Sequence, residues 1–562
     1  MLINATDVCK SFGAEPVLER INFTINPGEK IGLVGPNGSG KTTLLRIILR
    51  EVEPDQGDIT IADDPEIGYV RQDVIADEEL TVGKALLGEM EELESRLTEL
   101  RKEIAASPDD EGELAKYEVI EEELATRFGN DYRSRCEKTL ANFGFGPDRY
   151  KTKVNRLSPG ERARLELARV LVREPEILIL DEPTNFLDIA QREWLELFLE
   201  RFNGTVLAVS HDRVFLNQVV NRVFELRRTR LTTYEGDYDD YELAREQERT
   251  KLAHDHDIQQ KEIHKLERVA GERKVWSARR EKTKTPAGDS GFVSHRAAKM
   301  AKRAKHAEKR IEQTIEKHEA RKPFIEKQPK PVLVTEELPD KRALLAKGLA
   351  KSFNGRKVIA GVSFEIRTGE RVALVGPNGC GKTVLLRMLL GEVKPDKGEA
   401  QLGAGTKVGY FPQDVTSLDL ECTALDEVMR GLPRLSAEEN RGCTPVAQET
   451  ARAVLGTLLL PKEFAEKKLA ELSAGERSKV LLARILAGGA NFLILDEPSN
   501  HLDIDALLAL EGLLSQMPCG VLFASHDRAL LGKLADRVLE LKDGAVLDHR
   551  ERYETLSAKR TE

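Results

Sequence analysis

The chain has 562 residues, of which 32% are charged and 5% are aromatic, and its formal net charge is −10 at pH 7. This length predicts several domains, each with its own hydrophobic core. The sequence contains neither a signal peptide nor an apolar run near the roughly 18 residues of a membrane span, so we expect a cytoplasmic protein without a membrane partner. Its six cysteines form no CxxC pair, which argues against a zinc site and a disulfide framework.

Short β-like runs broken by glycine and proline turns make up residues 1–35, a pattern typical of an antiparallel subdomain before a parallel core. Phe12 lies in this region, about thirty residues before Lys41, and Phe353 has the same place in the second half. A flat ring at this position could stack on a purine, or it could be an ordinary core residue. The sequence leaves both interpretations open.

Two phosphate-binding loops are the strongest signals in the chain. Residues 31–45, IGLVGPNGSGKTTLL, and 372–386, VALVGPNGCGKTVLL, each join an apolar β-like run to GxxxxGKT and a helical segment. The glycines let backbone N–H groups surround an anion, the helix adds its positive end, and the lysine would reach the β- and γ-phosphates of ATP. The predicted ATP-binding residues here are Gly35, Asn37, Gly38, Gly40, Lys41, Thr42, Thr43, Gly376, Asn378, Gly379, Gly381, Lys382 and Thr383.

The motifs occur twice in the same order. The two loop lysines are 341 residues apart, as are Gln72 and Gln413, whereas the three motifs that follow are 315 residues apart. The first half therefore carries 341 − 315 = 26 extra residues, and the chain is a tandem duplication with one insertion.

The extra residues lie between about 82 and 130. Leucines at helical spacing in EELESRLTELRKEI and EGELAKYEVIEEELATRF predict two amphipathic helices around the turn SPDDEG. We interpret this segment as a helical arm that stands off the first domain. The alternative is a solvated helix pair without a partner.

Later motifs in each half would complete a nucleotide site. LSPGE and LSAGE place Ser158 with Gly160, and Ser473 with Gly475, before helical patterns, so each predicts an anion-binding helix start. Apolar runs that end in Asp-Glu predict buried parallel strands whose carboxyl ends face the ligand, and a further run brings a histidine to the same edge.

Phosphoryl transfer from ATP to water needs a charge clamp, a metal and a positioned water. The predicted Mg²⁺ ligands are Thr42 with Asp181 and Thr383 with Asp496. Glu182 and Glu497 would polarise the attacking water, Gln72 and Gln413 would bridge metal and water, and His211 and His526 would sense the γ-phosphate.

A basic linker, residues 241–331, joins the halves. It predicts a helix from near Leu243 to Lys282, a tip at about 284–292 and a second helix. Residues 273–310 hold thirteen Lys and Arg against three Asp and Glu, a local charge of +10. This asymmetry favours an anionic partner over a merely solvated face. The candidate RNA contacts are Arg279, Arg280, Lys284, Phe292, Lys302 and Arg303.

Taken together, these motifs resemble the ATPase cassettes of the ABC superfamily, and the paired cassettes, arm and basic linker resemble the ABC-F family of ribosome-associated ATPases. The resemblance implies an α/β fold with two P-loop ABC-type domains, residues 1–240 and 332–562, joined by a helical hairpin. It implies a monomer whose cassettes pair head to tail, so that Lys41 shares a site with Ser473 and Lys382 with Ser158. It also implies that the arm and the linker bind the ribosome at its E site, near rRNA and P-site tRNA.

The linker stretch 291–310 resembles those of the antibiotic-resistance branch, which implies protection of the ribosome from peptidyl-transferase-centre drugs. The alternative within the family is a housekeeping translation factor. Alternatives from other classes are the ATPase subunit of an ABC transporter and a DNA-repair ATPase. Three departures bear on the comparison: Phe186 stands where the second half has His501, Cys380 stands where the first has Ser39, and the tip is short.

Overall fold

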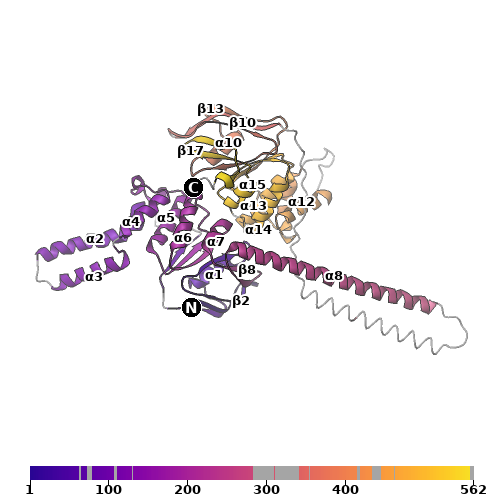
Figure 1. Cartoon of the computed structure of the whole chain (residues 1–562), viewed down its shortest axis with the longest axis horizontal. Coiled ribbons are helices and arrows are strands. Elements are labelled where there is room, and N and C mark those ends of the chain that lie inside the picture. The colour runs from indigo at the N-terminus through magenta and orange to yellow at the C-terminus, as the bar shows by residue number, and fades with distance from the viewer. Residues whose placement is uncertain are drawn as a thin grey trace. The chain divides into compact units, whose positions relative to one another are not determined.

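The computed structural model describes residues 1–62, 65–71, 79–106, 111–129, 131–282, 309, 341–353, 355–413, 418–432, 445–460, 462–500 and 502–556. The chain divides into two compact units, Met1–Tyr238 with Pro329–Glu562, and Asp239–Gln328. The first unit contains both halves of the repeat (Figure 1). Among the described helices, none combines the length and the apolar character needed to cross a bilayer.

The first cassette has two sheets. The smaller is antiparallel, in the order β2 (Glu15–Ile25), β1 (Ile3–Phe12), β4 (Gln56–Ile61). The larger has the order β5 (Ile67–Val70), β6 (Ile177–Asp181), β7 (Thr205–Val209), β3 (Lys30–Val34), β8 (Arg222–Arg227), β9 (Arg230–Glu235). Only β9 pairs antiparallel in this sheet. Every position of β6 and β7 is buried, which explains why their sequences are nearly continuous apolar runs, as is typical of parallel strands.

Helices cover the larger sheet of the first cassette. They are α1 (Lys41–Ile48), α5 (Pro159–Arg173), α6 (Ile189–Arg201) and α7 (Arg213–Val219). One face of α1 is buried against both sheets, where Leu44, Leu45 and Ile48 join Ile31 and Leu33 in one core. Packing of α1 against β3 therefore fixes the loop between them.

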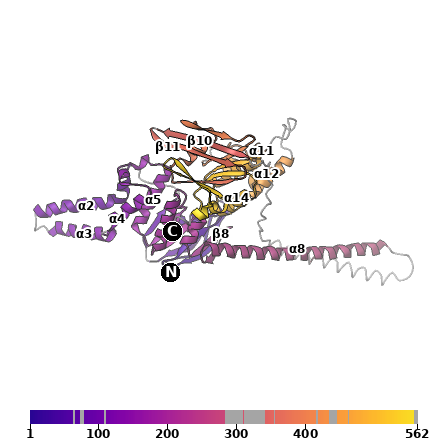
Figure 2. The ribbon, with the colours of Figure 1, turned by 45° about the horizontal axis from the view of Figure 1, so that its top comes forward.

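The second cassette repeats this architecture (Figure 2). Its antiparallel sheet has the order β11 (Arg356–Arg367), β10 (Arg342–Phe353), β13 (Lys397–Leu402). Its larger sheet has the order β14 (Val408–Phe411), β15 (Phe492–Asp496), β16 (Gly520–Ala524), β12 (Arg371–Val375), β17 (Arg537–Lys542), β18 (Ala545–His549). Its helices are α10 (Lys382–Leu389), α11 (Ala424–Gly431), α12 (Pro445–Thr457), α13 (Ala474–Ala487), α14 (Ile504–Gln516) and α15 (Arg528–Leu534). The predicted α/β fold with two cassettes joined by a linker region is confirmed.

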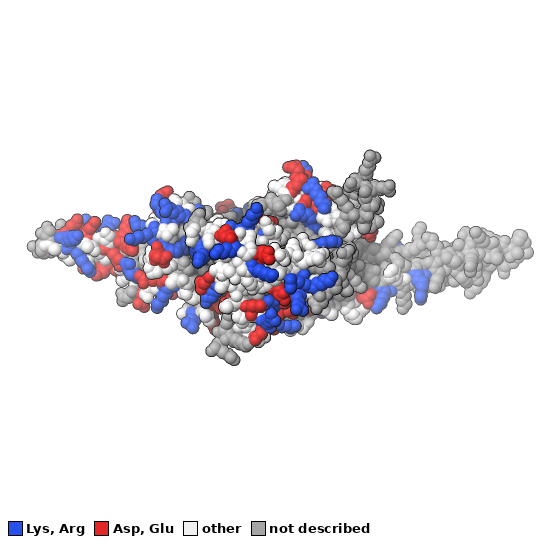
Figure 3. All heavy atoms as spheres, turned by 90° about the horizontal axis from the view of Figure 1, so that it is seen from above, with Lys and Arg blue, Asp and Glu red and all other residues white. Residues whose placement is uncertain are grey.

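In the inserted segment, α2 (Val82–Ala106) and α3 (Glu111–Arg127) lie side by side, and α4 (Tyr132–Asn142) follows. Leu97, Leu100 and Ile120 are buried between α2 and α3 in a small cluster of their own. The outer faces of these helices mix acidic and basic side chains (Figure 3). Part of the predicted turn, residues 107–110, lies outside the described residues. Short 3₁₀ turns, η1 (Pro147–Arg149) and η2 (Val154–Arg156), precede α5, and η3 (Lys462–Glu466) and η4 (Leu469–Glu471) precede α13.

The linker begins with α8 (Tyr238–Lys282), which starts five residues before the predicted Leu243. Ion pairs along the helix, such as Lys261 with Asp257 at 2.6 Å, support this long and strongly charged element. The backbone of Arg279 and Arg280 belongs to α8. Their side chains, the predicted tip and the candidates Lys284, Phe292, Lys302 and Arg303 lie outside the described residues.

Candidate active sites

The first phosphate-binding loop curls between β3 and α1 around its own lysine. Lys41 is only 8% exposed, and its Nζ donates hydrogen bonds to the carbonyl oxygens of Gly35 (2.7 Å) and Pro36 (3.1 Å). Gly35 lies against β8, where an added Cβ would be 2.2 Å from the carbonyl oxygen of Leu226. The loop is therefore a tight turn around the buried ammonium group of Lys41, as an anion-binding loop requires.

The second loop has the same form. Lys382 Nζ donates to the carbonyl oxygen of Gly376 at 3.0 Å, and Gly376 lies against Leu541 as Gly35 lies against Leu226. One contact differs, because Lys382 Nζ is also 2.8 Å from Nε2 of His526. In the first cassette His211 Nε2 instead lies 3.3 Å from Oδ1 of Asn37.

Oxygen ligands suited to Mg²⁺ lie beside the first lysine. The hydroxyl of Thr42 donates to Oδ2 of Asp181 at 3.3 Å, which brings together residues 139 positions apart. A hydroxyl and a carboxylate are hard oxygen donors of the kind that Mg²⁺ prefers, so these residues fit the ion. Thr383 and Asp496 hold the corresponding places at the start of α10 and the end of β15.

Glu182 and Glu497 follow directly after β6 and β15 in left-handed backbone conformations, with φ of 53° and 49°. Such a conformation costs about 1–3 kcal/mol for a non-glycine residue, and it turns each buried carboxylate toward the loop. Burial raises the pKa of Glu182 to about 8, although nearby Lys41 opposes the shift. Burial also raises the pKa of Glu497.

Each switch histidine follows a buried strand and is tied to the glutamate of its cassette. The N–H of His211 donates to Oε2 of Glu182 at 3.3 Å, and that of His526 donates to Oε2 of Glu497 at 3.2 Å. Burial and the neighbouring Lys41 lower the pKa of His211 to about 3. Burial likewise lowers the pKa of His526, so both imidazoles are neutral at physiological pH.

The LSxGE motifs begin α5 and α13 as capping boxes. The hydroxyl oxygens of Ser158 and Ser473 each accept a hydrogen bond from the backbone N–H of the glutamate three residues later. The carboxylate of that glutamate accepts a hydrogen bond from the backbone N–H of the serine. A pocket of about 450 Å³ joins residues of both cassettes. Its lining includes Phe12, Asn37, Gly38, Gly40, Lys41, Thr42, Thr43, Asp181, Glu182 and His211 from the first cassette and Ser473 and Gly475 from the second.

At the second loop the first cassette makes the reciprocal approach. The N–H of Asn378 donates to Oδ2 of Asp188 at 3.3 Å, as that of Asn37 donates to Asp503 at 3.2 Å. The side-chain amide of Asn378 donates to the carbonyl oxygen of Phe186 at 3.0 Å. A Cβ added at Gly160 would lie 3.5 Å from the ring of Phe186, so the start of α5 belongs to this side of the interface.

Comparison with known proteins identifies the family. A family model described as ABC transporter matches residues 18–185 and 359–500, one segment in each half. The chain is 34% identical to the putative ATP-binding protein YdiF of Bacillus subtilis (strain 168), over 100% of this chain and 83% of that protein. It is 29% identical to ABC transporter F family member 5 of Arabidopsis thaliana, over 97% of this chain and 76% of that protein. The chain belongs to the ABC-F family of tandem ABC ATPases.

This ABC-F protein is also 33% identical to the energy-dependent translational throttle protein EttA of Escherichia coli (strain K12), over 94% of this chain and 89% of that protein. Among solved structures, RNase-L Inhibitor matches 98% of this chain and 92% of its own with a TM-score of 0.59. At 18% identity that likeness shows the fold alone. The family expected from the motifs is confirmed, and the antibiotic-resistance branch is not addressed by these relatives.

Some predicted residues are exposed, and others lie outside the part of the chain that the structure describes. Phe12 and Phe353 are 57% and 45% exposed, so neither ring is an ordinary core residue. Gln413 is exposed just after β14, whereas Gln72 and His501 lie outside the described residues.

Sequence reasoning missed the ion pairs that join the cassettes of this ABC-F protein. Arg213 pairs with Glu511, and Arg528 pairs with Glu196. The two arginines are 315 residues apart, and so are the two glutamates. The sequence therefore held a usable signal, because an arginine follows each switch histidine by two residues. Arg227 also pairs with Asp505 across the interface.

Replacing Ser473 with alanine is expected to lower the free energy of unfolding by about 1 kcal/mol, because the capped N–H of Glu476 loses its acceptor. The same holds for Ser158 and α5. Urea denaturation of the full chain measures the loss. Ser95→Ala removes an exposed hydroxyl inside α2 and is the matched control. Equal stability of the Ser473→Ala and Ser95→Ala variants would show that the cap contributes nothing.

Proposed function

We propose that this ABC-F protein is a cytoplasmic ATPase that binds the ribosome with ATP between its closed cassettes and leaves after hydrolysis to ADP and phosphate. The observation that carries the proposal is the pocket lined by Lys41, Glu182 and Ser473, because it offers a phosphate clamp, a carboxylate and a helix start from the opposite cassette. A site built from two cassettes links nucleotide binding to closure.

Each residue has a distinct role in this proposal. The lysines exchange their loop carbonyls for phosphate oxygens, and Thr42 with Asp181, and Thr383 with Asp496, hold Mg²⁺, which supplies charge neutralisation when bound. Glu182 and Glu497 would orient the attacking water and accept its proton. The neutral histidines would hydrogen-bond the γ-phosphate, Gln72 and Gln413 would contact the metal and the attacking water, and Phe12 and Phe353 would stack on adenine.

Support for a ribosomal partner comes from charge and kinship. Residues 273–310 carry a net charge of +10 within a chain of −10, which suits an RNA surface. The relative EttA is a translational throttle by name, which places a family member in translation. We accordingly propose residues 241–331 as the RNA-binding linker between domains 1–240 and 332–562, with rRNA and P-site tRNA as its partners and the arm at 82–130 as a second ribosomal contact.

Protection of the ribosome from antibiotics is a second candidate role. It rests on the resemblance of residues 291–310 to linkers of resistance proteins, whereas the kinship with EttA favours a role in translation itself. Both roles require the same ATPase sites and the same partner, so a drug dependence separates them.

Ribosome co-sedimentation tests the proposal. We expect the full chain to pellet with ribosomes in the presence of a non-hydrolysable ATP analogue and to remain in the supernatant with ADP. Pelleting that is enhanced by lincosamide, pleuromutilin or streptogramin A drugs would favour the protective role. Equal pelleting with the analogue, with ADP and without nucleotide would contradict the coupling of closure to binding.

Neutralising Arg279, Arg280, Lys302 and Arg303 with glutamine is expected to lower the salt dependence of ribosome binding. Four phosphate contacts at about 0.9 units each predict a slope of log affinity against log salt that is smaller by about 3 to 4. Pelleting at a series of salt concentrations measures the slope.

A matched control neutralises four exposed basic residues of the second cassette, Arg356, Lys357, Lys394 and Lys397. We expect this control to change the slope by less than about one unit. Slopes that fall equally in the two variants would reject the linker as the RNA contact.

A further inference from the structure

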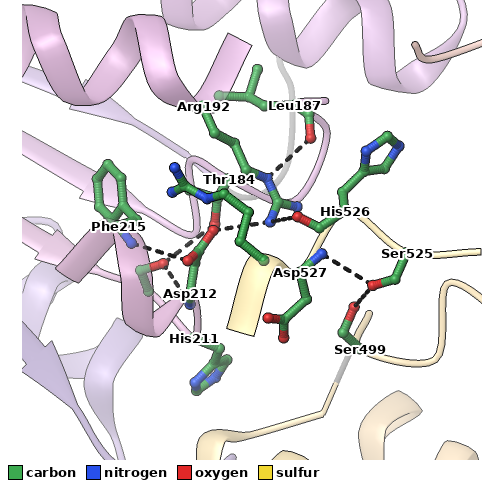
Figure 4. Close-up of polar contacts among 12 residues, drawn as sticks. Thr184, Leu187, Arg192, His211, Asp212, Phe215, Ser499, Ser525, His526 and Asp527 are labelled. Atoms are coloured by element: carbon green, nitrogen blue, oxygen red, sulfur yellow. Dashed lines mark hydrogen bonds and ion pairs between the residues drawn. The ribbon is translucent and has the colours of Figure 1, made fainter. Parts of the chain in front are cut away.

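A single buried guanidinium connects the two cassettes at their switch loops (Figure 4). Arg192 lies on α6 and is only 7% exposed. Within its own cassette, Nε donates to the carbonyl oxygen of Leu187 at 3.1 Å and Nη1 donates to Oδ2 of Asp212 at 2.9 Å. Nη1 also donates to the carbonyl oxygen of His526, in the opposite cassette, at 2.9 Å.

Among the described residues, the contact has no counterpart on the other side of the interface. The offset of 315 that relates the two pairs Arg213–Glu511 and Arg528–Glu196 places Leu507 where the first cassette has Arg192. Leu507 is 1% exposed in the core of the second cassette, and its side chain has no hydrogen-bond donor. The interface is therefore symmetric in these two ion pairs and asymmetric at this position.

Arg192 provides the second hydrogen bond that holds the backbone of His526. The N–H of His526 is held by Glu497 at 3.2 Å, and its carbonyl oxygen is held by Arg192. The corresponding N–H of His211 is held by Glu182, but the position that would hold its carbonyl is occupied by leucine. The main chain of His526 is thus restrained from both cassettes.

The two switch imidazoles also differ in their hydrogen bonds. Lys382 Nζ can only donate, so Nε2 of His526, at 2.8 Å, is the unprotonated nitrogen of that ring. Nε2 of His211 faces the oxygen of Asn37 and donates to it. The restrained histidine is therefore the one that engages its loop lysine directly.

Charge explains why an arginine suits this position. Asp212 and Asp527 follow the two switch histidines, and both are buried near the interface. Burial and the nearby Asp212 raise the pKa of Asp527, and Arg213 and Arg192 both oppose the shift. The guanidinium therefore compensates two buried acids while it orients the peptide.

We propose that Arg192 is a positioning residue for the site of Lys382. It sets His526 when the first cassette docks, so that this site depends on closure through a contact that the site of Lys41 lacks. The inference rests on the proposed ATPase function and makes the two sites unequal. We assign Arg192 this positioning role and not a direct contact with the nucleotide.

Site-resolved turnover tests the inference. In the background of Glu182→Gln, ATP turnover reports the site of Lys382, and in that of Glu497→Gln it reports the site of Lys41. We expect Arg192→Leu to lower turnover at the Lys382 site by about tenfold or more, the effect of losing a hydrogen bond from a charged donor. Turnover at the Lys41 site should stay within about threefold.

Three further variants exclude a general loss of structure. Arg192→Leu with Asp212→Asn also removes the carboxylate that pairs with Arg192 and should show the same site preference. Arg192→Lys retains a donor and should restore part of the turnover. Glu200→Gln changes an exposed charge near the end of α6 and should affect the two sites alike. Equal losses at both sites with Arg192→Leu, or an unchanged Lys382 site, would overturn the inference.

A chain that hydrolyses no ATP would refute the proposed function without deciding the inference, which is then tested by binding. A fluorescent ATP analogue is titrated in the Lys41→Ala background for the Lys382 site and in the Lys382→Ala background for the Lys41 site. Arg192→Leu should weaken binding about fivefold or more at the Lys382 site alone. Equal affinities would overturn the inference.

Discussion

Replacement of Glu182 and Glu497 together with glutamine is expected to lower ATP turnover by about 10³-fold, since a positioned general base contributes 10²–10⁴-fold. Both carboxylates lie buried at the ends of β6 and β15, within hydrogen-bond reach of a switch histidine N–H. Glutamine keeps the size of the side chain and an acceptor for that N–H. It cannot take a proton from water, so binding should persist while hydrolysis stops.

Phosphate release measures turnover, and a fluorescent ATP analogue measures binding. Glu193→Gln, an exposed position on α6, is the matched control and should retain full turnover. The double variant should also pellet with ribosomes in the presence of ATP, because the closed form is trapped. Turnover within tenfold of the unmodified chain would remove these two residues from the reaction.

Gly35→Ala and Gly376→Ala are each expected to weaken nucleotide binding at their own site by about 100-fold, as severe overpacking does. The added Cβ would lie 2.2 Å from the carbonyl oxygen of Leu226 or 2.3 Å from that of Leu541. These oxygens belong to central strands β8 and β17, which cannot yield without disturbing the sheet. The loop must move instead, and its N–H groups leave the phosphates.

Titration with the fluorescent analogue in single-site backgrounds measures the change. Gly38→Ala is the matched control within the first loop, because Gly38 also has a positive φ, 77°, but a Cβ there meets nothing within 4 Å. We expect this control to cost less than about tenfold, the effect of backbone strain alone. If Gly35→Ala binds as tightly as Gly38→Ala, the close approach to β8 does not shape the loop.

The repeat made much of the fold predictable. Motifs at fixed offsets located both loops, both Asp-Glu strands and both switch histidines, and parallel strands bring such carboxyl ends to one edge, as the contact of Thr42 with Asp181 illustrates. The sequence did not predict Arg192, because its value depends on packing across the interface, and its repeat partner is a leucine. The sequence also left the exposure of Phe12 and Phe353 undecided. A β-strand pattern predicts that side chains alternate between two faces, but it does not show which face is buried.

The arm is a projecting helix pair whose base contacts α5 of the first cassette. The base of α2 is anchored by Leu86, Leu87 and Met90, and Glu89 pairs with Arg173 in the last turn of α5 at 2.8 Å. From there α2 continues for sixteen residues to Ala106, about 24 Å at 1.5 Å per residue. A force at the far end of the arm is therefore applied as torque to α5, whose opposite end carries Ser158. Mechanical load on the arm would reach Ser158 through α2, its contacts with α5 and α5 itself.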